Sequence, residues 1–154
     1  MNVKEEIKDT KTETEQALIL GHLQLYQEPI SRMSSISAIF KGFAAAILAG
    51  LASASFTDIS EWALLIGLIP LLAFLCLDIY YLQLEKKLRY RYKMVALGKD
   101  KVDFLIRPQI DDSEKKEAKA CISDCLKSPS IFLFYIPVLA CAVVLAVMKF
   151  KGEL

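Results

Sequence analysis

The sequence is poor in the side chains that most often perform chemistry. Its single histidine, His22, has no evident partner for acid–base work. Cys121 and Cys125 lie four residues apart, but with only one histidine elsewhere a closed zinc site is disfavoured, and packing is the better interpretation. The six glycines lie singly, so there is no glycine-rich loop that cradles phosphate. We therefore expect no enzyme activity, no cofactor and no bound metal.

The sequence also lacks the marks of a disulfide framework and of a signal peptide. Cys76 and Cys141 lie inside apolar runs, and the other two cysteines lie in a segment that we expect in the cytoplasm, where thiols stay reduced. The first ten residues, MNVKEEIKDT, are charged and contain no apolar core of a cleavable signal sequence. We expect free cysteines and no cleavable signal peptide.

Apolar residues are abundant, and they occur in blocks. Hydrophobic residues make up 55% of the 154 residues and the mean hydropathy is +0.38, although 24% of the residues are charged. Such a composition, with charged residues and apolar residues sorted into separate stretches, is typical of an integral membrane protein. We expect an all-α integral membrane protein with three transmembrane helices and cytoplasmic helical extensions.

Three segments are apolar enough to cross a bilayer. The first is expected at roughly 36–56, where Lys41 is the only charge. The second begins with residues 62–77, which carry no charge and would cover about 24 Å as a helix. The third, residues 128–148, is also free of charge and is the clearest spanning segment of the chain.

The second span is expected to continue as one helix beyond the membrane. Tyr80 and Tyr81 are placed to form an aromatic belt, and a run of basic residues follows as far as Lys93. Nothing predicts a break before Gly98, because membrane helices tolerate a single proline such as Pro70. The result is a rod that runs from lipid into a basic cytoplasmic stalk.

This layout divides the chain into four parts. They are a cytoplasmic N-terminal helix at 1–35, a transmembrane helical hairpin at 36–84, the basic stalk with a connector helix at 85–128, and the third transmembrane helix at 129–150. In the first part, Pro29 interrupts an apolar stripe and is expected to kink or break the helix. In the third part, Asp111 and Glu114 have capping-box spacing, which predicts one helix at about 113–126.

The distribution of basic residues predicts the orientation. The loop at 57–60 contains no lysine or arginine, whereas both other flanks of the hairpin do. Within it, Asp58 and Glu61 have capping-box spacing before the second span. By the positive-inside rule, the N-terminus and the stalk are cytoplasmic. Lys149 and Lys151 weakly oppose this orientation, but the basic excess of the stalk is larger.

Small residues recur along the first span. Gly42, Ala46, Gly50 and Ala54 follow one another at four-residue spacing. Small side chains in this register let two helix backbones approach closely, which favours helix association in lipid. The face that they form either packs on the second span of the same chain or lines an interface or pore between subunits, and the pattern leaves both open.

Asp78 is the most informative acidic residue. It lies sixteen residues after Trp62, about 24 Å along a helix, and therefore near the cytoplasmic headgroups. One interpretation is an ion pair with Lys41 or Arg32 at this level. The other is a role at a gate or ion vestibule, with Lys41 and Ser53 as further polar residues.

The stalk carries a local positive charge. Residues 85–107 contain eight basic and three acidic residues. Attraction to anionic lipid headgroups is the first explanation of such a surface. The alternative is a ligand site for an anion, since guanidinium groups suit phosphates and aromatic rings suit bases. The candidate ligand-binding residues are Arg89, Arg91, Lys93, Lys86, Arg32 and Tyr90. Because positions two apart point in different directions on a helix, several stalks of an oligomer would have to close such a pocket.

The sequence resembles a group of small bacterial membrane proteins. The resemblance lies in YQEPISRMSSIS before the first span, in the Asp-X-Tyr-Tyr-Leu stretch that leads into LEKKLRYRY, and in SIFLFYIP at the start of the last span, and it covers roughly residues 24–140. These proteins are similar to multi-span effectors of anti-phage signalling systems driven by cyclic oligonucleotides or by TIR-domain enzymes. The resemblance implies an effector that oligomerises and disrupts the bacterial inner membrane on infection, with residues 85–89 as the best-matched functional stretch.

Two functions are therefore expected from the sequence. The first is a homo-oligomeric membrane channel or membrane-disrupting effector, gated by a cytoplasmic signal that is a nucleotide second messenger or a signalling protein. The alternative is a non-conducting anchor or regulatory subunit that recruits a cytoplasmic partner. In both, the lipid bilayer is a partner and no nucleic-acid polymer is expected.

Overall fold

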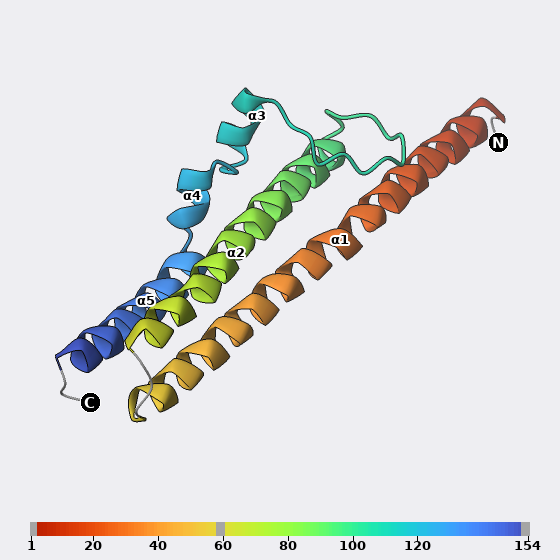
Figure 1. Ribbon diagram of the computed structural model, residues 1–154. Helices are drawn as coiled ribbons and strands as arrows, with labels where there is room; N and C mark the ends of the chain where they lie inside the picture. The colour runs from red at the N-terminus through yellow and green to blue at the C-terminus, as the bar shows by residue number, and fades with distance from the viewer. Residues whose placement is uncertain (1–2, 58–60, 152–154) are drawn as a thin grey trace.

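The computed structural model describes residues 3–57 and 61–151, which form five helices and no strand (Figure 1). The helices are α1 (Val3–Ser55), α2 (Glu61–Ala96), α3 (Asp112–Glu117), α4 (Ile122–Leu126) and α5 (Pro129–Phe150). In the described part of the chain, α1, α2 and α5 are each long and apolar enough to cross a membrane. The expectations of an all-α fold and of three helices able to span are therefore confirmed.

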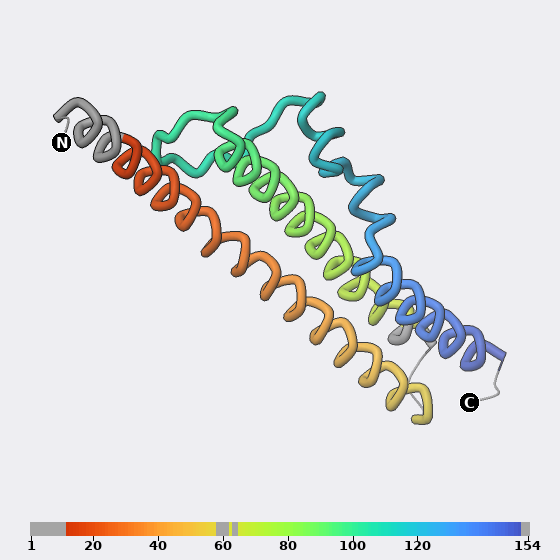
Figure 2. The backbone as a smooth tube through the Cα atoms, turned by 180° about the vertical axis from the view of Figure 1, so that it is seen from behind, coloured from red at the N-terminus to blue at the C-terminus, as the bar shows by residue number. Residues whose placement is uncertain are grey.

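α1 and α2 lie side by side as a long antiparallel hairpin, and α5 packs beside the first half of α2 (Figures 1 and 2). The C-terminal end of α1 and the start of α2 lie near the end of α5 that leads to the C-terminus, and α3 and α4 run back along α2. We call this end, where α1 ends and α2 begins, the hairpin end. The opposite end, where α2 stops and the segment 97–111 begins, is the polar end. Asp58, which the sequence pairs with Glu61 in a predicted capping box, lies outside the described residues.

The three spans are held together by an apolar core near the hairpin end. Its buried residues come from all three helices: Ala44, Leu71, Ile131, Tyr135, Val138 and Ala142. Lys149 of α5 adds a polar contact there, because its Nζ donates to the carbonyl oxygens of Ser55 at 3.2 Å and Thr57 at 2.7 Å. These carbonyls belong to the C-terminal end of α1, where a cation satisfies unpaired acceptors and the helix dipole. Lys149, which the positive-inside rule did not explain, thus caps a helix.

α1 continues through Pro29 without a break. Proline removes one helical hydrogen bond, so packing has to hold the flanking turns. Tyr26 and Leu88 are 2% exposed and form a second core between α1 and α2, to which Ile30 and Met33 also contribute. Apolar contacts on both sides of Pro29 therefore keep the two turns in line.

α2 ends where the sequence predicted. Gly98 has a φ of 68°, the N–H of Gly98 donates to the carbonyl of Val95, and the N–H of Lys99 donates to the carbonyl of Met94. This pair of bonds is a Schellman motif, which requires a left-handed residue and so favours glycine.

The single helix expected at 113–126 is wrong, because the segment forms two short helices, α3 and α4. Lys119 adopts a left-handed φ of 50° and ends α3. The next residue, Ala120, is fully buried, and its carbonyl accepts a hydrogen bond from Gln83 Nε2 of α2 at 2.8 Å. Contact with α2 therefore redirects the chain. The predicted Asp111–Glu114 box is present at the start of α3, where Glu114 Oε2 accepts from the Asp111 N–H at 2.9 Å.

Candidate functional site

A buried polar cluster joins α1 and α2. The Asp78 side chain is completely buried and forms an ion pair with Lys41, with 2.8 Å between Lys41 Nζ and Asp78 Oδ2. Ser37, one turn before Lys41, donates a hydrogen bond to Asp78 Oδ1 and accepts one from Lys41 Nζ at 2.7 Å. The predicted pairing of Asp78 with Lys41 is confirmed. The hydrogen bond from Ser37 to Oδ1 and the ion pair of Oδ2 with Lys41 offset the cost of burying the carboxylate.

The third span also reaches this cluster. Tyr135 of α5 is 2% exposed, and its hydroxyl donates to the carbonyl of Phe74, one turn before Asp78, at 3.4 Å. Ser37, Lys41 and Asp78 thus join α1 to α2, and Tyr135 joins α5 to α2 one turn away. We refer to these four residues as the interspan cluster.

Arg32 and Ser53 do not belong to the interspan cluster. Arg32 is exposed and forms no ion pair in the described part of the chain. Ser53 is exposed and donates to the Ala49 carbonyl of its own helix. It lies twelve residues beyond Lys41, about 18 Å along α1. The structure therefore groups Asp78 with Lys41 and places Ser53 near the hairpin end.

Four of the six candidate ligand residues, Lys86, Arg89, Tyr90 and Lys93, line one hollow, whereas Arg91 and Arg32 do not line it. Arg91 binds the segment 97–111, with 3.0 Å from its Nη1 to Asp100 Oδ2 and 2.9 Å from its Nη2 to the Gln109 carbonyl oxygen. Its Nη2 also lies 3.8 Å from Glu114 Oε2. Residues 97–128, which link α2 to α5, are called the connector, and Arg91 holds the connector against α2.

Tyr90 and Lys86 likewise hold the connector. The Tyr90 hydroxyl donates to Glu117 Oε2 at 3.1 Å, and desolvation together with this carboxylate raises the pKa of Tyr90. Lys86 Nζ donates to the carbonyl of Asp124 at 3.2 Å. These contacts attach α3 and α4 to one side of α2.

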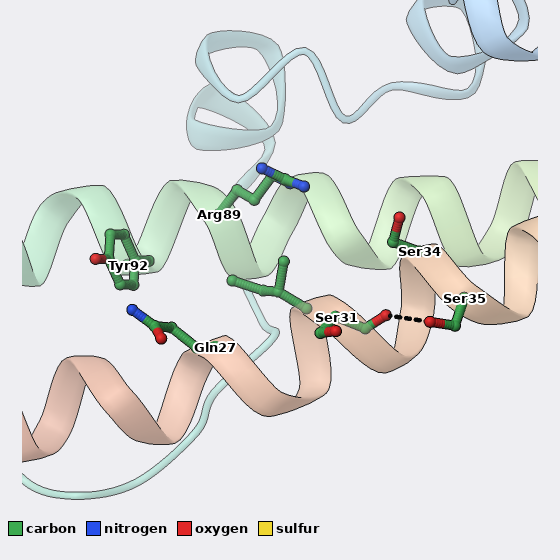
Figure 3. A pocket seen from close by; sticks show the side chains of 7 residues that line it. Gln27, Ser31, Ser34, Ser35, Arg89 and Tyr92 are labelled. Carbon is green, nitrogen blue, oxygen red and sulfur yellow. Dashed lines mark hydrogen bonds between the residues drawn. The ribbon is translucent and has the colours of Figure 1, made fainter.

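Arg89 lies between two hollows on the surface of α2. On one side, Lys86, Arg89, Tyr90 and Lys93 meet Glu117 and Ala118 around a hollow of about 250 Å³. On the other side, facing α1, lies a larger hollow of about 420 Å³ (Figure 3). We call the larger one the α1–α2 groove. It is lined by Gln27, Ile30, Ser31, Ser34, Ser35, Arg89 and Tyr92.

The small-residue face of α1 is open within one chain. A Cβ added to Gly42 or Gly50 meets no atom within 4 Å, and Ala46 between them is exposed. The glycine that does lie in a close helix contact is Gly67 of α2, where an added Cβ meets the Leu51 side chain of α1. Close packing of α1 on α2 therefore uses Gly67, and the face of Gly42 and Gly50 has no partner in the described part of the chain.

Sequence reasoning missed several polar residues. Ser37 carried a usable signal, because it lies four residues before Lys41 and so shares its helix face. Tyr135 carried none, since it lies 57 residues after Asp78 in a charge-free span. The groove residues of α1 lie in the stretch YQEPISRMSSIS that carries the resemblance, but uncharged serines and a glutamine before a span gave no sign that they line a groove.

Comparison of the chain with protein-family models, with curated proteins and with solved structures gives no match.

Replacing Arg91 by Ala is expected to release the segment 97–111. The change removes charge-assisted hydrogen bonds worth about 1.5–3 kcal/mol, so trypsin should cleave after Lys99 or Lys101 roughly tenfold faster than in the wild type. Arg89→Ala is the matched control, because in the described part of the chain the only hydrogen-bond and ion-pair partner of Arg89 is Glu85 of its own helix. Equal cleavage rates in the two variants would show that Arg91 does not hold the segment.

Proposed function

We propose that this protein is a three-span channel or membrane-disrupting effector of the bacterial inner membrane that works as a homo-oligomer. Its N-terminus and polar end lie in the cytoplasm, as the positive-inside rule favours, and a cytoplasmic signal, nucleotide or protein, opens it. A role in anti-phage defence follows from the sequence resemblance. No catalytic step is part of this proposal.

The observation that carries the proposal is the interspan cluster. A fully buried carboxylate between transmembrane helices is expensive, and such residues usually mark an ion pathway or a moving contact. Asp78 is paired with a lysine on another helix, so a change in how α1 and α2 pack changes the pairing of the charge. The cluster is thus suited to hold one arrangement of the spans until a signal favours another.

The open face of α1 supports the oligomeric part of the proposal. Gly42, Ala46 and Gly50 leave the backbone accessible, which suits close helix contact between two copies. Conduction would then run between subunits, with the interspan cluster at the cytoplasmic end of each three-helix unit.

One observation favours the alternative, a non-conducting anchor. Val102, Phe104, Leu105 and Ile106 of the connector are all exposed large hydrophobic residues at the polar end. Contiguous exposed apolar residues away from lipid mark a protein interaction site. In this function, the spans hold the protein in the bilayer and the connector recruits a cytoplasmic partner.

The test is ion flux through the purified protein in liposomes, with membrane potential measured in expressing cells. Asp78→Asn removes the charge that holds Lys41, so we expect basal potassium efflux at least about tenfold above wild type without any activator, which corresponds to a loss of ~1.4 kcal/mol of closed-state preference. Asp112→Asn, at an exposed acid of α3, should leave flux unchanged. If neither Asp78→Asn nor the wild type conducts ions, in infected cells as well as in liposomes, the non-conducting anchor is favoured.

A further inference from the structure

The α1–α2 groove collects polar groups from two helices at the level where α1 enters its apolar span. Gln27, Ser31 and Ser34 come from successive turns of α1, and Arg89 and Tyr92 come from one turn of α2 (Figure 3). Ile30 adds an apolar wall. A hollow of about 420 Å³ has the size of a site for a small organic ligand.

Most of the polar groups in this groove are not used by the protein itself. In the described part of the chain, the side chains of Gln27, Ser31, Ser34 and Tyr92 form no hydrogen bond, whereas Ser35 Oγ donates to the Ser31 carbonyl at 3.0 Å. An amide, two serine hydroxyls and a phenol are therefore available to a ligand that carries both acceptors and donors.

Arg89 supplies the charge. Glu85 accepts a hydrogen bond from Arg89 Nε at 2.7 Å, which fixes the side chain through one edge, and the terminal nitrogens Nη1 and Nη2 have no hydrogen-bond partner among the described residues. Terminal guanidinium nitrogens are the donors that bind phosphate oxygens in pairs. The smaller hollow on the other side of Arg89 is less suited to an anion, because the Glu117 carboxylate lies in its wall.

We propose that the α1–α2 groove binds a phosphate ester joined to a hydroxyl-bearing group, with the phosphate on Arg89 and the hydroxyls on Gln27, Ser31 and Ser34. Two sources carry this chemistry, the headgroup of an anionic phospholipid and a soluble nucleotide. The site is complete within one chain and does not need several stalks.

Binding here would act on the interspan cluster through α1. Ser34 lies one turn before Ser37, which hydrogen-bonds Asp78. A ligand that bridges Arg89 of α2 and Ser34 of α1 holds the two helices together about one turn of α1 before this contact. This consequence rests on the proposed function, whereas the binding itself does not and is measured without ion flux.

The experiment uses the full chain in nanodiscs. The soluble arm titrates adenosine monophosphate into phosphatidylcholine discs and measures affinity by calorimetry, and the lipid arm measures enrichment of phosphatidylglycerol around the protein by native mass spectrometry. Arg89→Gln should weaken binding about tenfold or more in the arm that reports the true source, because it removes a charge-assisted contact. Lys87→Gln, which removes an equal charge outside the groove, should change it less than about twofold.

A second pair of variants separates the groove from general surface charge. Gln27→Glu places a carboxylate beside the phosphate position with almost no change in shape and should also weaken binding about tenfold, whereas Gln24→Glu, exposed one turn earlier, should not. Weakening by Arg89→Gln and Gln27→Glu in the nucleotide arm assigns a soluble ligand, and in the lipid arm a headgroup. Absence of binding in both arms, or equal effects of the groove variants and their controls, overturns the proposal.

Discussion

Replacing Lys41 by Met is expected to destabilise the protein by about 3–5 kcal/mol, the usual effect of removing one partner of a buried ion pair. The variant leaves the Asp78 carboxylate completely buried with Ser37 as its remaining partner on α1. The measurement is the midpoint of unfolding in detergent by added denaturant, followed by circular dichroism.

A second substitution shows whether the loss of stability in Lys41→Met arises from the unpaired buried carboxylate of Asp78. Lys41→Met combined with Asp78→Leu removes both charges, so the double variant should recover most of the lost stability even though it forms no ion pair. Lys87→Met, which removes a lysine that forms no ion pair in the described part of the chain, is the control. Equal losses for Lys41→Met and Lys87→Met would mean that the Asp78–Lys41 pair does not stabilise the fold.

Leucine at Gly42 or Gly50 is expected to separate subunits without harming the single chain. Among the described residues, a Cβ added at either glycine finds no neighbouring atom within 4 Å outside the adjacent backbone of α1, so we expect the single chain to accept a larger side chain there. If this face packs against a second copy, leucine forces the two backbones apart. The dissociation constant of the oligomer should then rise by roughly an order of magnitude or more. Cross-linking in membranes and the mass of the detergent-solubilised protein measure this.

Gly67→Leu, in contrast, is expected to destabilise the single chain. Its side chain would meet Leu51 of α1, and overpacking of this kind destabilises a core by about 1–3 kcal/mol. We expect lower unfolding stability of the chain with Gly67→Leu and unchanged stability with Gly50→Leu. Should Gly42→Leu and Gly50→Leu leave the oligomeric state unaltered, the open face of α1 is not a subunit interface.

The helices of this protein were determined largely by the order of residue types. Long apolar runs with at most one charge are stable in lipid, where a helix satisfies its own backbone groups, so the spans within α1, α2 and α5 could be predicted from the sequence. Gly98 and the Asp111–Glu114 pair act through local backbone geometry, and they mark the end of α2 and the start of α3 as predicted. The Asp78–Lys41 pair was also within reach, because both residues lie at a similar distance from the hairpin turn.

Tertiary contacts decided the rest, because they join residues that the sequence keeps far apart. In the sequence, Arg91 has no evident partner. In the structure, the segment after α2 folds back and places Asp100 and the Gln109 carbonyl within hydrogen-bond distance of it. The break between α3 and α4 depends on a hydrogen bond from α2 to Ala120, which no local propensity encodes. Which glycines lie between helices, and which uncharged side chains line a groove with Arg89, depends on the rotation of α1 against α2. That rotation is set by the sum of many side-chain contacts, and a pattern along one helix does not contain it.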